Sequence, residues 1–217
     1  MAEQKPTLVY FDFNGGRGEH IRLAFHINGV EFNDERISFP TFKADWKDSG
    51  KAPNGSLPVL SIGDHLYTQS TAILRYAGSS GKRLLYPTDL TQALLVDQLA
   101  ENWNDFGSSA PQDSNNDEKK RKREEWQAEG GGYHTWLTRI NKQVGSNGYS
   151  VGNTLTTADL AAFVTIKGIR SGAWDYVDGK TIDKYANLVA IYNTVEAHEG
   201  VKAWNALRAE REKPTTS

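Results

Sequence analysis

The stretch that decides the fold runs from Leu57 to Tyr76 and reads LPVLSIGDHLYTQSTAILRY. Two short apolar runs flank the pair Gly63-Asp64, which is typical of a β-hairpin turn. Ser70 then opens an apolar segment directly after the second run, and this order predicts a helix. We therefore expect two antiparallel strands followed by a helix whose N-terminus lies at the edge of a sheet.

The same stretch carries the polar groups of a candidate binding site. The first N–H groups of the helix, the Gln69 amide and the Ser70 hydroxyl suit a ligand carboxylate, because the helix dipole places partial positive charge there. The alternative is that Ser70 only caps its helix. Pro58 favours the binding site: a cis Leu57–Pro58 bond would turn the backbone N–H and C=O of Leu57 toward the same edge. A thiol tripeptide could lie along Leu57 like an added strand.

Composition excludes several classes of function. The chain has 217 residues and 38% hydrophobic content, enough for two small domains. A net charge of −2 gives no general attraction to nucleic acid or anionic membranes. There is no cysteine, so any redox role needs a borrowed thiol. Without a signal-like N-terminus or an apolar run of membrane-spanning length, we expect a soluble cytoplasmic protein.

The first 80 residues show an alternating pattern of strands and helices. Thr7–Phe11 reads as a strand, Glu19–Asn28 as a helix closed by Gly29, and Val30–Ser38 as a second strand. Residues 39–56 contain scattered prolines and glycines, so we expect a loop that covers the site. With the hairpin and its helix, the order is βαβ-ββα, an α/β thioredoxin-like domain over residues 1–80.

A glycine-rich segment, Asp12–Gly18, joins the first strand to the first helix. It lacks the third glycine of a dinucleotide-binding loop, because Ile21 stands at that position, and no Gly-Lys-Ser/Thr follows for a P-loop. We expect these glycines to let the turn pass close to Tyr10.

The remainder of the chain reads as helical. Residues 81–90 have the composition of a linker, and residues 91–217 form an all-α domain with amphipathic helices. Gly130-Gly131-Gly132 should kink or break one helix, at about 1 kcal/mol per glycine relative to alanine. The basic run Lys119–Arg123 is flanked by acidic residues, which favours a solvated helix face over a nucleic-acid or nuclear-import role. Thr156 and Asp159 form a capping-box pattern before an apolar helix.

The chain resembles a cytosolic glutathione S-transferase of the tyrosine type, the branch that contains the sigma, pi, mu and alpha classes. The residues that carry the resemblance are Tyr10, Leu57-Pro58, Gln69-Ser70 and the Thr156–Asp159 pattern. The resemblance spans nearly the whole chain. It implies that residues 1–80 bind glutathione as a co-substrate and that the all-α domain completes a pocket for a small hydrophobic electrophile. It also implies a transferase with a role in detoxification, and a homodimer.

The resemblance assigns roles to individual residues. Tyr10 would donate its hydroxyl hydrogen to the glutathione sulfur, and Arg17 would lie near the thiol. Glu101 would reach the ligand's amino group in the other subunit. The remaining glutathione contacts implied by the resemblance are Trp46, Lys51, Leu57, Pro58, Gln69 and Ser70.

The electrophile side has two interpretations. Aromatic side chains could line an apolar pocket, but aromatics at helical spacing also occur in cores; these residues are Phe11, Phe13, Trp103 and Phe106. The five histidines show no metal-binding spacing, so we expect no metal. Two classes of function stay open. The first is an enzyme that conjugates glutathione to small electrophiles, or uses it as a cofactor to isomerise or reduce them. The second is a catalytically weak binding or structural protein on the same scaffold.

Overall fold

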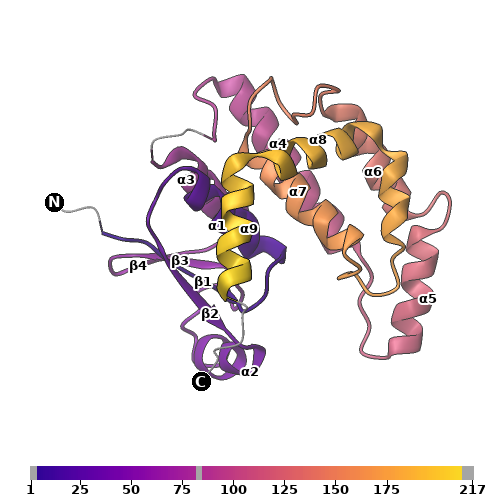
Figure 1. Cartoon of the computed structure of the whole chain (residues 1–217). Helices are drawn as coiled ribbons and strands as arrows, with labels where there is room; N and C mark the ends of the chain where they lie inside the picture. Colours follow the sequence, from indigo (N-terminus) through magenta and orange to yellow (C-terminus); the bar gives the residue numbers. More distant parts are fainter. Residues whose placement is uncertain (1–3, 82–84, 212–217) are drawn as a thin grey trace. The chain divides into compact units, whose positions relative to one another are not determined.

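The computed structural model describes residues 4–81 and 85–211, and the chain divides into two compact units (Figure 1). The first unit comprises Met1–Leu85 together with Glu196–Ser217, and the second comprises Tyr86–Val195. The linker predicted at residues 81–90 includes residues 82–84, which lie outside the described residues.

The first unit is built on a four-stranded mixed sheet with strand order β2-β1-β3-β4. β1 is parallel to β2 and antiparallel to β3, and β3 is antiparallel to β4. The βαβ-ββα order is confirmed, and its elements are β1 Thr7–Phe11, α1 Gly16–Ile27, β2 Asn33–Ile37, β3 Val59–Ile62, β4 His65–Tyr67 and α3 Ser70–Ser79.

Side chains of β1 alternate between the two faces of the sheet, as a pleated strand requires. Leu8 is fully buried on the face that also holds Tyr10. Val9 points the other way and packs in a cluster with Ile37, Trp46 and other apolar residues. The sheet therefore has an apolar layer on each face.

The segment between β2 and β3 contains two short helical pieces in place of a long helix. α2 spans Phe39–Thr41 and the π-helix η1 spans Phe42–Lys47. Trp46 from η1 is 4% exposed and anchors this segment against the sheet. The sequence analysis expected a loop here, so the two short helical pieces differ from that expectation, whereas the absence of a long helix agrees with the irregular composition.

The C-terminal helix α9, Glu199–Arg211, belongs to the first unit and packs against α1. The sequence analysis assigned it to the all-α domain of residues 91–217. The structure differs because the Trp204 indole N–H donates to Glu19 Oε1 on α1 at 2.8 Å, and Arg208 pairs with the same oxygen at 3.1 Å. The buried acidic side chain on α1 therefore holds the end of the chain.

The second unit is helical, as expected. Gly130 has a φ of 78° and Gly131 precedes the first turn of α6, so the glycine run separates two helices. No helix among the described residues is long and apolar enough to cross a membrane. The elements are α4 Leu90–Ser109, α5 Asn116–Gln127, α6 Gly132–Gln143, α7 Thr157–Arg170, η2 Gly179–Lys184 and α8 Ala186–Ala197.

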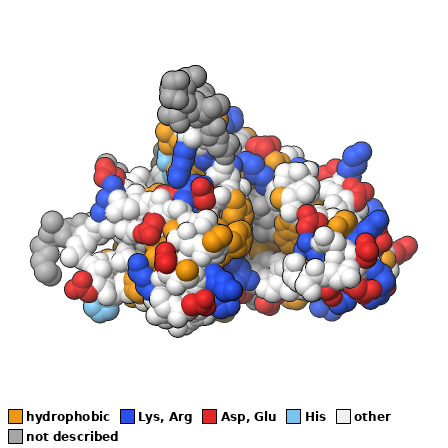
Figure 2. Space-filling view, turned by 90° about the horizontal axis from the view of Figure 1, so that it is seen from below, with side chains coloured by type: hydrophobic (Ala, Val, Ile, Leu, Met, Phe, Trp, Pro, Cys, Tyr) orange, Lys and Arg blue, Asp and Glu red, His pale blue; other side chains and the backbone are white. Residues whose placement is uncertain are grey.

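Helix α5 carries the basic run, whose side chains pair with acidic residues or donate to carbonyl groups. Arg123 is buried and donates to the carbonyl oxygens of Pro111 and Asp175. Acidic and basic side chains are also interspersed on the face shown in Figure 2. The structure thus supports a compensated helix face; the other ion pairs are Lys119–Asp175, Lys120–Glu124, Arg121–Glu118, Arg121–Glu125 and Lys122–Asp113.

The capping box at the start of α7 is present. Asp159 is fully buried and accepts the Thr156 N–H at 2.7 Å and the Thr156 hydroxyl at 2.8 Å. It also accepts the Ser150 N–H at 2.5 Å. Asp159 therefore joins the loop before α7 to the helix start, which is the structural role that its sequence position predicts.

Candidate functional site

Tyr10 lies near the C-terminal end of β1 and is 6% exposed. Its hydroxyl oxygen accepts the backbone N–H of Arg17, from the first turn of α1, at 3.1 Å. Because that bond uses an oxygen lone pair, the hydroxyl hydrogen remains available for donation to another acceptor. Burial raises the pKa of Tyr10, against an opposing effect of the nearby Arg17 and Arg22 charges. The phenol is therefore protonated at neutral pH and suited to be a hydrogen-bond donor.

The glycines after β1 are required for this arrangement. A Cβ atom on Gly16 would lie 2.7 Å from the Tyr10 hydroxyl oxygen, and one on Gly18 would overlap the Tyr10 ring. Gly16 also has a φ of 62°, which side chains rarely tolerate. The close approach of the turn to Tyr10, which the sequence analysis predicts, is confirmed.

The strand register brings the other candidate residues to the same end of the sheet. Val9 on β1 pairs with Val59, the first residue of β3, and Leu60 pairs with Tyr67, the last residue of β4. Leu57-Pro58 precedes β3 and Gln69-Ser70 follows β4, so both pairs lie beside the end of β1 that carries Tyr10. The Leu57–Pro58 peptide bond is cis, as the sequence analysis proposed.

The backbone of Gln69 is unusual. Its φ of 73° and ψ of 111° lie in a region that residues other than glycine rarely occupy. Such strain costs about 1–3 kcal/mol and is concentrated at ligand sites. Gln69 is the N-cap residue of α3, and buried Ser70 is the first helical residue, so Ser70 does not occupy the capping position. The alternative interpretation of Ser70 as an N-cap is wrong.

Trp46 and Lys51 are in contact with each other. The Trp46 ring is buried, and the Lys51 ammonium lies 4.1 Å from its centroid. The ring therefore has a packing role in the first unit, in addition to the glutathione contact that the resemblance implies for it. Lys51 is exposed on the ring face, where its charge can reach an anionic ligand.

Glu101 is exposed on α4, within the second unit, and accepts a hydrogen bond from Asn104 at 3.2 Å. Arg17 is exposed on α1. Its backbone N–H bonds the Tyr10 hydroxyl oxygen, and its positive charge lowers the pKa of both Tyr10 and His20, against the larger effect of burial on Tyr10 and together with it on His20.

The four aromatic residues proposed for the electrophile pocket separate into three environments. Phe13 is 42% exposed, with its ring 5.7 Å from the Tyr10 ring. Phe11 points to the other sheet face and stacks on Phe39 at 4.2 Å. Trp103 and Phe106 are buried, and Phe106 stacks on Trp126 and Trp174 in the core of the second unit. Trp103 and Phe106 are therefore core residues, as their helical spacing also allowed.

The sequence analysis missed Arg22, which holds the turn around Tyr10. Its side chain is fully buried, and its guanidinium donates to the carbonyl oxygens of Phe11 at 3.3 Å and Phe13 at 3.1 Å. It also pairs with Glu19 and Asp34. The available signal was the three-residue spacing of Glu19 and Arg22, which places opposite charges on one face of the helix.

Buried His20, also on α1, was not assigned a role either. Burial lowers its pKa to about 3, and its Nε2 atom has no partner among the described residues. The described residues also contain no group of three or more His, Cys, Asp or Glu side chains that could hold a metal ion.

Comparison with family models identifies both halves of the chain. Residues 6–79 match the glutathione S-transferase N-terminal domain, and residues 103–208 match a glutathione S-transferase C-terminal domain. The two models together span both units of the structure.

Individual relatives agree with this result. Hematopoietic prostaglandin D synthase of Gallus gallus is 30% identical over 91% of this chain and 93% of its own length. A solved prostaglandin synthase D of Nilaparvata lugens is 28% identical, covers 94% of this chain and 98% of its own, and has a TM-score of 0.77. A glutathione S-transferase of Necator americanus, solved as a monomer, is 23% identical, covers 98% of this chain and 100% of its own, and has a TM-score of 0.69.

Proposed function

The chain belongs to the glutathione S-transferase family and is an enzyme of that family, and we propose that it activates the glutathione thiol through the Tyr10 hydroxyl for attack on small hydrophobic electrophiles. A free thiol with a pKa of about 8.5 is only about 3% ionised at pH 7. Lowering that pKa by about two units requires about 2.7 kcal/mol of preferential stabilisation of the thiolate. A hydrogen bond from a buried, protonated phenol contributes directly to this.

The observation that carries the proposal is the state of the Tyr10 hydroxyl. Its oxygen accepts the Arg17 N–H, and burial keeps it protonated. The hydroxyl hydrogen of Tyr10 can then be donated to a thiolate. Tyr10 acts as a donor and not as a base, and the Arg17 guanidinium adds positive charge near the sulfur.

Glutathione lies along Leu57-Pro58 as an added strand in this proposal. Its γ-glutamyl end is held by Gln69 and Ser70 at the start of α3, where the helix dipole favours a carboxylate. Lys51, with Trp46 behind it, meets the glycine carboxylate. Phe13, exposed beside Tyr10, contacts the electrophile. Such conjugation would serve detoxification, and we expect it to occur in the cytoplasm.

The test is a titration of the enzyme-bound thiol. The thiolate absorbance of bound glutathione, followed against pH, should give a lowered thiol pKa in the wild-type protein. Tyr10→Phe should retain glutathione binding but shift this pKa upward and lose most conjugation of a generic aryl halide, because only the hydroxyl is removed. An unchanged thiol pKa in Tyr10→Phe would refute the role of Tyr10.

A second candidate function is glutathione-dependent isomerisation. It is supported by the relatives named prostaglandin D synthase. The same thiolate would attack the substrate and be released at the end of the cycle, so glutathione would not be consumed. Measuring free thiol during turnover separates the two functions, because conjugation removes thiol in proportion to product and isomerisation leaves its amount constant.

A further inference from the structure

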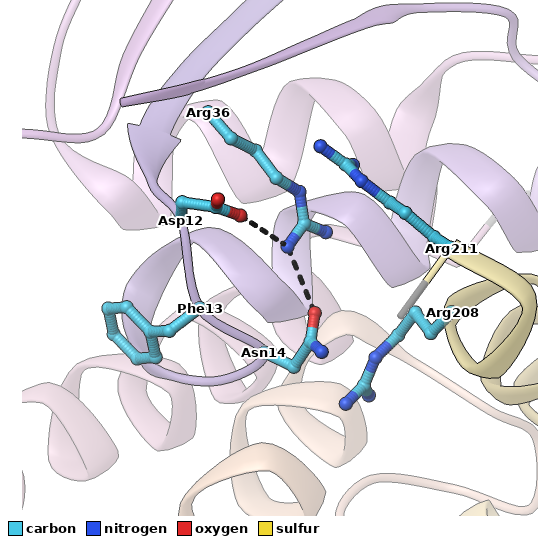
Figure 3. A pocket seen from close by; sticks show the side chains of 6 residues that line it. All are labelled: Asp12, Phe13, Asn14, Arg36, Arg208 and Arg211. Carbon is cyan, nitrogen blue, oxygen red and sulfur yellow. Dashed lines mark hydrogen bonds and ion pairs between the residues drawn. The ribbon is translucent and has the colours of Figure 1, made fainter. Parts of the chain in front are cut away.

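A pocket of about 450 Å³ lies in the first unit, beside the turn that follows β1 (Figure 3). The turn contributes Asp12, Phe13 and Asn14, and β2 contributes Arg36. Arg208 and Arg211 complete the lining from α9. Three arginines from two distant parts of the sequence thus meet around one hollow.

The arginines in the ion-pair network around this pocket outnumber the carboxylates that pair with them. Asp34 accepts from Arg22, Arg36 and Arg211 together, at distances of 2.8, 2.6 and 3.4 Å. Glu19 is shared between Arg22 and Arg208. Within these connected ion pairs, four guanidinium groups meet three carboxylates, which are Glu19, Asp34 and the Asp12 side chain 3.7 Å from Arg36. The network therefore carries an excess positive charge.

The arginines also have unused hydrogen-bond donors. A guanidinium presents five N–H donors. Arg208 Nε is buried and has no partner among the described residues. Arg211, whose side chain is 53% exposed, makes one bond within that part of the chain, to Asp34. The exposed Arg211 guanidinium therefore retains donors that an anionic group in the pocket could accept from.

We propose that this pocket binds the carboxylate, sulfonate or phosphate group of an organic anion, with Arg36, Arg208 and Arg211 around the charged group and exposed Phe13 at the rim against its apolar part. Arginine favours such groups because its planar fork matches their oxygen atoms.

The arginines of this subsite lie away from Gln69 and Ser70, while its rim residue Phe13 is also the residue proposed above to contact the electrophile. Arg36 pairs with Tyr10 in the strand register and lies on β2, one edge of the sheet. Gln69 and Ser70 follow β4, the opposite edge. The proposal goes beyond the glutathione-activating role and does not depend on it.

The test uses 2-naphthalenesulfonate as the anion and neutral 2-naphthalenemethanol as its uncharged counterpart, titrated calorimetrically with glutathione at saturation. The sulfonate should bind at one site and the alcohol should bind much more weakly. Arg211→Gln should weaken sulfonate binding about tenfold, the effect of losing one hydrogen bond to a charged group. Asp12→Asn should strengthen it about threefold, because a repelling carboxylate beside the pocket is neutralised.

Matched controls lie in the second unit. Arg139→Gln on α6 and Asp105→Asn on α4 change exposed residues and alter the net charge as the test variants do. Both should leave sulfonate affinity unchanged, and Arg211→Gln should leave glutathione affinity unchanged. The proposal is wrong if the sulfonate does not bind, if glutathione displaces it, or if Arg211→Gln and Asp12→Asn match their controls. In those cases the arginines serve only to hold α9.

Discussion

At the scale of single residues, Gln69 combines a strained backbone with an exposed amide at the end of β4. A residue other than glycine remains at a φ of 73° only where the surroundings or a function require it. Replacement by glycine would remove the steric cost, whereas replacement by alanine would keep it. The two substitutions remove the same amide, so they separate ligand binding from backbone strain.

We predict that Gln69→Ala, Gln69→Gly and Ser70→Ala each weaken glutathione binding by about 1.5–3 kcal/mol, because each removes a contact to a charged group. Gln69→Gly should at the same time raise the free energy of unfolding by about 1 kcal/mol relative to Gln69→Ala. Calorimetric titration gives the affinities, and urea unfolding gives the stabilities. Wild-type affinity in both alanine variants would remove Gln69 and Ser70 from the glutathione site.

A second residue-scale prediction concerns buried His20. Its pKa is lowered to about 3 in the folded protein, against 6.5 for an ordinary histidine, through burial and the Arg17 charge. Between these values the unfolded chain binds a proton that the folded chain does not. The free energy of unfolding therefore falls as the pH falls through this window, by about 3 kcal/mol at pH 4.

Replacing His20 with leucine should remove that part of the pH dependence. Urea unfolding between pH 7 and pH 4 should give a flatter profile for His20→Leu than for the wild type. His65→Leu, on exposed β4, is the control and should keep the wild-type slope. Parallel profiles for His20→Leu and wild type would show that the buried imidazole accepts a proton freely.

The conformation of a residue can be predicted from the sequence when it depends mainly on neighbouring residues in the chain. The hairpin turn at Gly63-Asp64 and the closeness of the glycine turn to Tyr10 depend on neighbouring residues, and both were predicted. The positive φ of Gln69 could not be, because glutamine has no intrinsic preference for that region. Phe106 became a core residue through packing on Trp126 and Trp174, which periodicity alone could not distinguish from a pocket wall.

At the scale of elements, α9 lies in the segment predicted to be helical, but the sequence did not predict that it belongs to the first unit. Its bond partner Glu19 lies 185 residues from Trp204, and no pattern in either segment identifies the other. Glu19 in turn pairs with Arg22, which holds the carbonyl groups of the turn beside Tyr10. Helix α9 is thus connected to the candidate site through two buried side chains.

We predict that Trp204→Phe lowers the free energy of unfolding by about 2 kcal/mol, because it leaves a buried carboxylate with one donor fewer. Trp136→Phe, on α6 in the second unit, is the matched loss of one tryptophan and should have a smaller effect. Hydrogen exchange should show faster exchange of α1 and α9 amides in Trp204→Phe. Equal stability of the two variants would mean that the Trp204–Glu19 bond contributes nothing measurable.

At the scale of the whole molecule, α4 presents an apolar stripe. Leu90 and Leu94 are 85% and 67% exposed and lie one turn apart. Glu101 follows Leu94 by seven residues, which places it on the same face of the helix. Exposed leucines in this arrangement are typical of an interaction surface. We propose that two copies of the chain associate through this face as a two-fold dimer, an arrangement in which Glu101 of the partner subunit reaches the ammonium group of bound glutathione.

The interface is tested by Leu94→Glu, which should yield a monomer in sedimentation equilibrium because two like charges would be buried against the symmetric surface. Leu207→Glu, on exposed α9, is the matched control and should stay dimeric. A wild-type protein that is monomeric at micromolar concentration would contradict the prediction, and the relative from Necator americanus shows that a monomer is possible on this fold.

The crossing of Glu101 is tested by a mixed dimer of one Tyr10→Phe subunit and one Glu101→Ala subunit. If Glu101 acts across the interface, one site has both defects and the other has neither, so half of the sites regain wild-type activity. If Glu101 acts within its own subunit, every site keeps one defect and none is intact. Activity per site in the isolated mixed dimer, compared with each parent homodimer, therefore distinguishes the two arrangements without any assumption about how the two units of one chain are placed.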